Sequence, residues 1–192
     1  LARTAFYLRI LGLDNPGENL GRMLTLFVGI AIVVLSAVAV DVAVRRVSRA
    51  PRPIAIVLGL VSALALYLNR EVVPWIDILR PLPLTTVLIL VVLLTLLIKH
   101  AHEVGTWTHF LPMVLWTTFA LSLLAKMALN VHIYHYGFYL PMPATLVLVV
   151  CLLYWIPKLL ADTSGCGVVF RSQVVAVLIV AILYHLNWSE KF

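Results

Sequence analysis

Long apolar stretches alternate with short polar segments along the whole of this 192-residue chain. A helix needs about 20 mostly apolar residues to cross the hydrocarbon layer of a bilayer. Six stretches have or approach this length, and they cover residues 23–44, 54–68, 82–98, 110–129, 138–156 and 168–186. The strands of a membrane barrel would instead alternate apolar and polar positions over about ten residues. We therefore predict an all-α fold, a polytopic transmembrane helix bundle of about six spans.

The composition narrows the class of protein further. Apolar residues make up 63% of the chain and charged residues 11%, and the mean hydropathy is +1.07. Soluble domains are about 45–50% apolar and about 25% charged. Because a water-soluble fold of this size could not bury the excess, a soluble enzyme and a soluble binding module are excluded. We expect a multi-pass protein of the cell membrane, with the lipid bilayer as its first partner.

No internal repeat or low-complexity linker divides the sequence, so we expect one transmembrane domain over residues 1–192. The chain begins Leu1-Ala2-Arg3-Thr4, without an initiator methionine or a signal peptide pattern. We expect a fragment of a longer protein that lacks upstream spans. Lys and Arg are divided evenly between the two predicted sides. The arginine-rich connector 45–52 is assigned to the cytoplasm, which places residues 130–137 on the outer face.

The chain carries 14 Lys and Arg against 8 Asp and Glu, a formal net charge of +6. In a membrane protein such an excess is typical of cytoplasmic loops and of contacts with anionic lipid headgroups. No basic face is long enough to follow a phosphate backbone, so we predict no nucleic-acid partner. Cys151 and Cys166 form neither a disulfide framework nor a C-x-x-C pair, and we interpret both as small apolar fillers.

The densest polar group, residues 126–139, joins the fourth and fifth predicted spans. Lysine supplies a fixed cation, asparagine supplies donors and acceptors, and histidines titrate near neutral pH. Together with tyrosine rings they suit a phosphate or sugar headgroup at the bilayer boundary. The alternative is an aromatic belt beside a snorkelling lysine. The candidate binding residues are Lys126, Asn130, His132, Tyr134, His135 and Tyr136.

Two groups of histidines are candidates for metal binding. One combines residues 99–103 with His109, and the other pairs His132 with His135. Adjacent residues on a helix do not share a face, and the spacing fixes no third ligand. We favour solvated loops and predict no metal site. A bis-histidine haem would need facing histidines inside the spans, so no cofactor is predicted.

Four charged residues outside the polar group 126–139 lead to further predictions. Asp41 and Arg45 are four residues apart, and this spacing predicts an ion pair near a helix end. Glu71 and Asp77 could form an acidic catalytic pair. We favour the interpretation that they are loop charges paired with the arginines nearby.

The stretch Leu124–Ala144, LAKMALNVHIYHYGFYLPMPA, resembles the later transmembrane part of bacterial membrane glycosyltransferases of the GT-C class. The resemblance is to the branch related to family 39, the dolichyl-phosphate-mannose protein mannosyltransferases. It rests on a lysine, an asparagine, a Tyr-His-Tyr-Gly run and a Met-Pro-Ala run that opens a late span. The remainder of the chain agrees only as a hydrophobic multi-span pattern.

The resemblance implies an integral membrane enzyme that transfers a sugar from a polyprenyl-phosphate donor to an acceptor on the extracytoplasmic face. The family's catalytic base is an acidic residue in the first outer loop. The chain has no counterpart of that loop, so no catalytic residue is assigned. A donor-binding role is implied for Lys126, Asn130, Tyr134, His135 and Tyr136. The lysine would neutralise the lipid phosphate, and the aromatic rings would face the sugar or the prenyl chain.

The leading hypothesis is the membrane part of a bacterial inner-membrane glycosyltransferase that contributes donor-binding rather than catalytic residues. Its expected partners are the polyprenyl-phosphate sugar donor and further subunits or missing N-terminal spans. A multi-span transporter would instead need polar residues deep inside spans and paired broken helices. A membrane scaffold or assembly subunit would need no small-molecule site.

Overall fold

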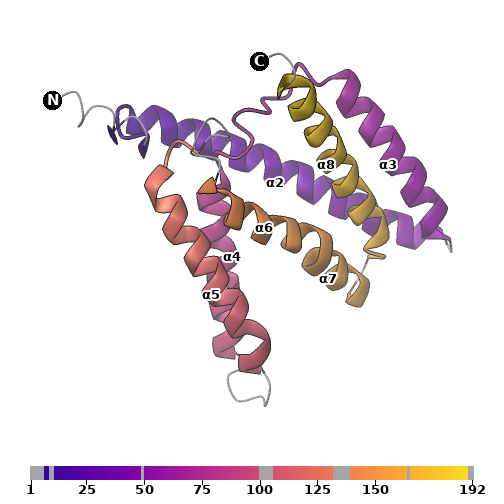
Figure 1. The fold of residues 1–192 in the computed structure, drawn as a ribbon. Coiled ribbons are helices and arrows are strands. Elements are labelled where there is room, and N and C mark those ends of the chain that lie inside the picture. Colours follow the sequence, from indigo (N-terminus) through magenta and orange to yellow (C-terminus); the bar gives the residue numbers. More distant parts are fainter. Residues whose placement is uncertain are drawn as a thin grey trace. The chain divides into compact units, whose positions relative to one another are not determined.

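The computed structural model describes residues 7–8, 11–48, 50–99, 106–131, 139–163 and 165–189. Every regular element in these ranges is a helix (Figure 1). The elements are α2 (Pro16–Val47), α3 (Pro51–Leu68), α4 (Leu82–Lys99), α5 (Thr106–Leu124), the 3₁₀ helix η1 (Ala125–Met127), α6 (Met142–Val150), the π-helix η3 (Cys151–Trp155), α7 (Ile156–Asp162) and α8 (Val168–Ser189).

Six helical segments are long and apolar enough to cross a bilayer, and α6, η3 and α7 together form one of them. The predicted all-α bundle of about six spans is therefore confirmed. Several hydroxyl groups within these spans are bonded to the backbone of their own helix. The hydroxyls of Thr86 and Thr117, for example, donate to the carbonyls four residues earlier, each at 2.7 Å. Such bonds remove the cost of placing an unpaired hydroxyl in an apolar surrounding.

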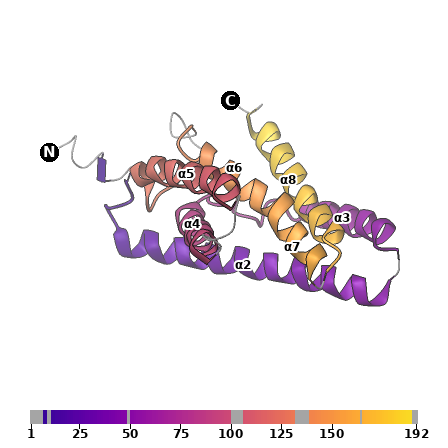
Figure 2. The ribbon, with the colours of Figure 1, turned by 90° about the horizontal axis from the view of Figure 1, so that it is seen from below.

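Contacts within the chain form two compact units. Unit 1 contains residues 1–29 and 76–149, and unit 2 contains residues 30–75 and 150–192. In unit 1, α4 and α5 pack side by side, as the views in Figures 1 and 2 both show. The face of α4 that is buried carries Leu82, Thr86, Ile89, Leu93 and Leu97. Their spacing of three or four residues places them along one side of the helix.

In unit 2, α3 and α8 pack closely because small residues lie where they meet. Ala55 and Gly59 are the buried positions of α3. A β-carbon at Gly59 would collide with the hydroxyl of Ser172, and this hydroxyl donates to the Ala55 carbonyl at 2.6 Å. Small residues that allow close backbone approach, with a hydroxyl bonded across the interface, are typical of helix pairs in membranes.

Many large apolar side chains lie on the outer surface of these helices. The exposed fractions are 65% for Leu35, 67% for Leu60 and 61% for Leu115. Monomeric soluble proteins rarely expose large contiguous apolar patches, whereas a bilayer solvates such a surface. The exposed surface thus agrees with the composition in defining a membrane protein.

Candidate functional site

The predicted binding residues begin where α5 ends, in unit 1. Lys126 lies in η1 with an exposed side chain. Asn130 follows one turn later, and its backbone N–H donates to the Met127 carbonyl at 3.0 Å. His132, Tyr134, His135 and Tyr136 lie outside the described residues. That the six residues form one binding site therefore stays a prediction.

The segment before α2 folds against the backbone around Asn130. The N–H of Leu129 donates to the Leu11 carbonyl at 3.2 Å. Gly12 has φ +73°, and a β-carbon there would lie 2.9 Å from atoms of both Leu129 and Asn130. Only glycine fits this conformation and this approach without strain. The beginning of the polar run is thus held in place by a segment more than 100 residues earlier in the chain.

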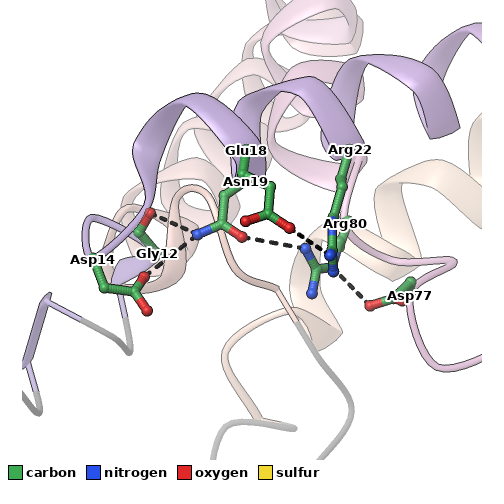
Figure 3. A network of polar contacts seen from close by, with 7 residues as sticks. All are labelled: Gly12, Asp14, Glu18, Asn19, Arg22, Asp77 and Arg80. Atoms are coloured by element: carbon green, nitrogen blue, oxygen red, sulfur yellow. Dashed lines mark hydrogen bonds and ion pairs between the residues drawn. The ribbon is translucent and has the colours of Figure 1, made fainter.

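A polar network extends from Gly12 to the start of α4 (Figure 3). The side-chain amide of Asn19 donates to the Gly12 carbonyl at 2.9 Å and to Asp14 Oδ1 at 3.4 Å. Its oxygen accepts a bond from Arg80 Nη1 at 3.4 Å. Arg80 in turn donates through Nε to Asp77 Oδ1 at 2.7 Å. Two successive hydrogen bonds therefore connect the Gly12 turn to Arg80, which is buried, with an exposed fraction of 9%.

The interpretation of Glu71 and Asp77 as loop charges paired with nearby arginines is confirmed. Glu71 lies 3.4 Å from Arg70, and Asp77 lies 2.7 Å from Arg80. On α2, Arg22 is paired with Glu18 at 2.5 Å. Lys126 has no carboxylate within ion-pair distance among the described residues.

Metal-ligand geometry is not found in the described part of the chain, where no three His, Cys, Asp or Glu residues gather. The segment 100–105 lies outside the described residues, as does His132 with His135. The side chain of His109 is likewise not described. The predicted absence of a metal site in these segments stays a prediction.

The bonding of one buried side chain in unit 2 was not predicted from the sequence. Asp41, near the end of α2, is 0% exposed. Its Oδ2 accepts the backbone N–H groups of Cys166 at 2.7 Å and Gly167 at 2.9 Å. Its Oδ1 accepts those of Val169 and Phe170, both at 3.0 Å, and the Cys166 thiol lies 3.2 Å away. Asp41 therefore caps the N-terminus of α8.

The predicted ion pair between Asp41 and Arg45 is wrong. Arg45 Nη1 instead donates to the carbonyls of Gly165 and Ala161, the latter at 3.2 Å. The physical reason is that the first N–H groups of α8 have no partner within their own helix and lie at its positive end. The Asp41 carboxylate satisfies two of them, those of Val169 and Phe170, together with the N–H groups of Cys166 and Gly167 in the turn before the helix. A signal was present in the sequence, because Gly165-Cys166-Gly167 offers α8 no capping side chain of its own.

Cys166 was interpreted as an apolar filler, and this was incomplete because its thiol and its N–H both face the Asp41 carboxylate. Gly167 beside it has φ +70°, and a β-carbon there would collide with the Pro157 carbonyl oxygen. The turn between α7 and α8 is thus closed by Asp41 on one side and by close backbone contact on the other.

A second irregularity precedes this turn. Pro157 has no N–H and cannot bond the Leu153 carbonyl four residues earlier, as a continuous α-helix would require. The chain forms the π-helix η3 at this point, and the Ile156 N–H bonds the Cys151 carbonyl five residues back. The freed Leu153 carbonyl accepts a bond from Arg171 Nε at 3.0 Å. Arg171 on α8 supplies the donor that proline lacks.

The fold and these sites define a multi-pass, all-helical membrane protein whose described charged side chains gather near the ends of its spans. Comparisons with known protein families, with curated proteins and with solved structures find no match to this chain. The resemblance of residues 124–144 to GT-C glycosyltransferases is accordingly a prediction that these comparisons leave open.

Proposed function

We propose that the chain is the membrane part of a bacterial inner-membrane glycosyltransferase that uses a polyprenyl-phosphate-linked sugar donor. Its role would be to bind the donor headgroup rather than to supply the catalytic base. The observation that carries the proposal is Lys126, an exposed cation without a described carboxylate partner, one turn before the anchored Asn130. A lysine at this place suits the phosphate of a lipid whose prenyl tail stays in the bilayer.

The surroundings of Lys126 support a headgroup site in two ways. The Gly12 turn packs against the backbone after Lys126, and the Asn19–Arg80 network bonds the Gly12 carbonyl. The backbone of the candidate site is therefore fixed from one side. The run that follows is rich in tyrosine and histidine, and these residues suit the hydroxyls and ring faces of a sugar. The extracytoplasmic location of this end, and the cell membrane as the compartment, belong to the same proposal.

Binding of a short-chain polyprenyl-phosphate hexose to the purified chain in detergent tests the proposal. Lys126→Ala should weaken binding by about tenfold to a hundredfold, because a charge-assisted bond to the phosphate is lost. Lys99→Ala is the matched control, because Lys99 is also an exposed lysine of unit 1 but lies outside the predicted site. Lys99 is the last residue of α4, whereas Lys126 follows the end of the neighbouring α5. Equal affinities for wild type and Lys126→Ala, with both proteins folded, would overturn the proposal.

A membrane scaffold or assembly subunit is the second candidate function. It is supported by the way buried polar groups are used: the Asp41 carboxylate caps α8, and Arg80 bonds Asp77 and Asn19. These groups stabilise helix ends and connectors and leave little for a ligand. A transporter has less support, since the bonding positions of the buried Asp41 are taken by backbone N–H groups. Normal folding without donor binding would favour the scaffold.

A further inference from the structure

One end of unit 2 is strongly basic and has no part in the function proposed above. Its described cations are exposed, and we call them the basic end of unit 2: Arg45, Arg46, Arg52, Lys158 and Arg171. The described acids near them are Asp41 and Asp162. Asp41 is fully buried and bonded to N–H groups, so Asp162 is the one described carboxylate that is exposed there.

Contacts within unit 2 show that these cations share one end. Arg45 bonds the Ala161 and Gly165 carbonyls at the end of α7. Ser172 bonds the Ala55 carbonyl, which aligns the first turns of α3 and α8. Arg52 and Arg171 therefore both lie in the first turn of helices that begin at the same end.

Arg171 differs from the other cations because its guanidinium is already fixed. Its Nε is bonded to the Leu153 carbonyl that Pro157 leaves without a partner. The two terminal amino groups make no described bond to a carboxylate, and the side chain is exposed. A guanidinium held at Nε keeps the fork geometry that suits two phosphate oxygens. Because its rotamer is restricted before binding, less entropy is lost when a ligand is bound.

Lys158 and Tyr154 add a second cation and an aromatic ring at the same end of unit 2. Lys158 Nζ lies 5.9 Å from the centre of the Tyr154 ring, and both side chains are exposed. Four more residues of its span follow Lys158, which corresponds to about 6 Å of helix. Arg171 lies three residues after the start of the next span, or about 4.5 Å of helix. Cations at this depth reach the headgroup layer, and tyrosine is enriched there.

We propose that the basic end of unit 2 binds the phosphate of an anionic phospholipid, held by Arg171 with Lys158. The site is assigned to the leaflet that faces the cytoplasm, together with the arginine-rich connector 45–52. The ligand is a lipid rather than a free anion. Both cations lie within spans, next to exposed apolar side chains such as Leu159 that would contact acyl chains.

Native mass spectrometry of the purified 192-residue chain, titrated with phosphatidylglycerol or phosphatidylcholine, tests the proposal. Phosphatidylglycerol should bind more tightly. Arg171→Gln and Lys158→Gln should each weaken its binding about fivefold, the effect of one cation near a lipid surface. Lys158→Gln leaves the Leu153 bond intact, so the test does not depend on folding of the Arg171 variant. Inorganic phosphate at millimolar concentration should not displace the lipid.

Arg46→Gln is the matched control, since it removes one charge from the same end without touching Arg171, and it should have a smaller effect. Equal losses in the Arg46 and Arg171 variants would show a diffuse charge effect and overturn the proposal. So would unchanged phosphatidylglycerol binding in the Lys158 variant, or displacement of the lipid by phosphate. Lys126→Ala should leave this binding unchanged, which separates the test from that of the sugar-donor site.

Discussion

Unit 1 and unit 2 each bury a charged side chain, but they stabilise it in different ways. In unit 1, Arg80 bonds the side chains of Asp77 and Asn19, at 2.7 and 3.4 Å. In unit 2, Asp41 bonds four backbone N–H groups at the start of α8, at 2.7 to 3.0 Å. Side-chain partners can turn to water when the charge is removed, whereas the N–H groups of a buried helix end cannot.

This difference indicates which unit tolerates change. The Asp77 side chain is 37% exposed and can be hydrated without Arg80. The N–H groups of Gly167, Val169 and Phe170 that face Asp41 belong to buried residues. Unit 2 should therefore be the more rigid at its polar centre, and unit 1 the more able to adapt to a ligand.

The largest expected effect is at Asp41. Asp41→Ala should lower the free energy of unfolding by about 3–5 kcal/mol, because several buried N–H groups lose their acceptor together. Asp41→Asn keeps one acceptor oxygen and should lose less. Unfolding of both variants in detergent, followed by circular dichroism, measures this. A loss below about 1 kcal/mol for the alanine variant would show that the cap contributes little.

A smaller loss is expected from the glycine that closes the same turn. Gly167→Ala should destabilise the chain by about 2–3 kcal/mol, since φ +70° is strained for alanine and the new methyl group meets the Pro157 carbonyl. Gly29→Ala is the control, because nothing lies within 4 Å of a β-carbon there and the residue is inside α2. That variant should be unchanged or more stable by about 0.5–1 kcal/mol.

The smallest effect is expected in the network of unit 1. Arg80→Gln should cost about 1–2 kcal/mol, because Asp77 becomes hydrated once its partner is lost. Arg22→Gln, which breaks the exposed pair with Glu18, should change stability by less than about 0.5 kcal/mol. If Arg80→Gln were as damaging as Asp41→Ala, the contrast between side-chain and backbone partners would be wrong.

The positions of the spans could be predicted closely from the sequence. The second span was expected at residues 54–68 and the sixth at 168–186, and the helices cover Pro51–Leu68 and Val168–Ser189. The break in the fifth span was not predicted. Pro157 was visible in the sequence, but the donor that compensates for it lies 14 residues further along, on another helix.

For the candidate site, the sequence identified residue types and could not identify partners. Lys126 and Asn130 were expected in one polar run beside the membrane surface, and that location and their shared binding role stay predictions. Nothing in the local pattern indicated that Gly12 would pack against Asn130, because the contact joins segments that are far apart in the chain. The same holds for Arg80 and Asn19.

The class of protein follows from the amino-acid sequence alone, since the length and apolarity of each span are local properties that the bilayer acts on directly. The sequence also shows where charge is concentrated. How that charge is used depends on the packing of the helices: Asp41 caps α8 instead of pairing with Arg45, and Arg171 replaces the donor that Pro157 lacks. The reason is that an unpaired N–H or carbonyl buried in an apolar surrounding must be bonded, and its nearest partner is chosen by packing rather than by sequence distance.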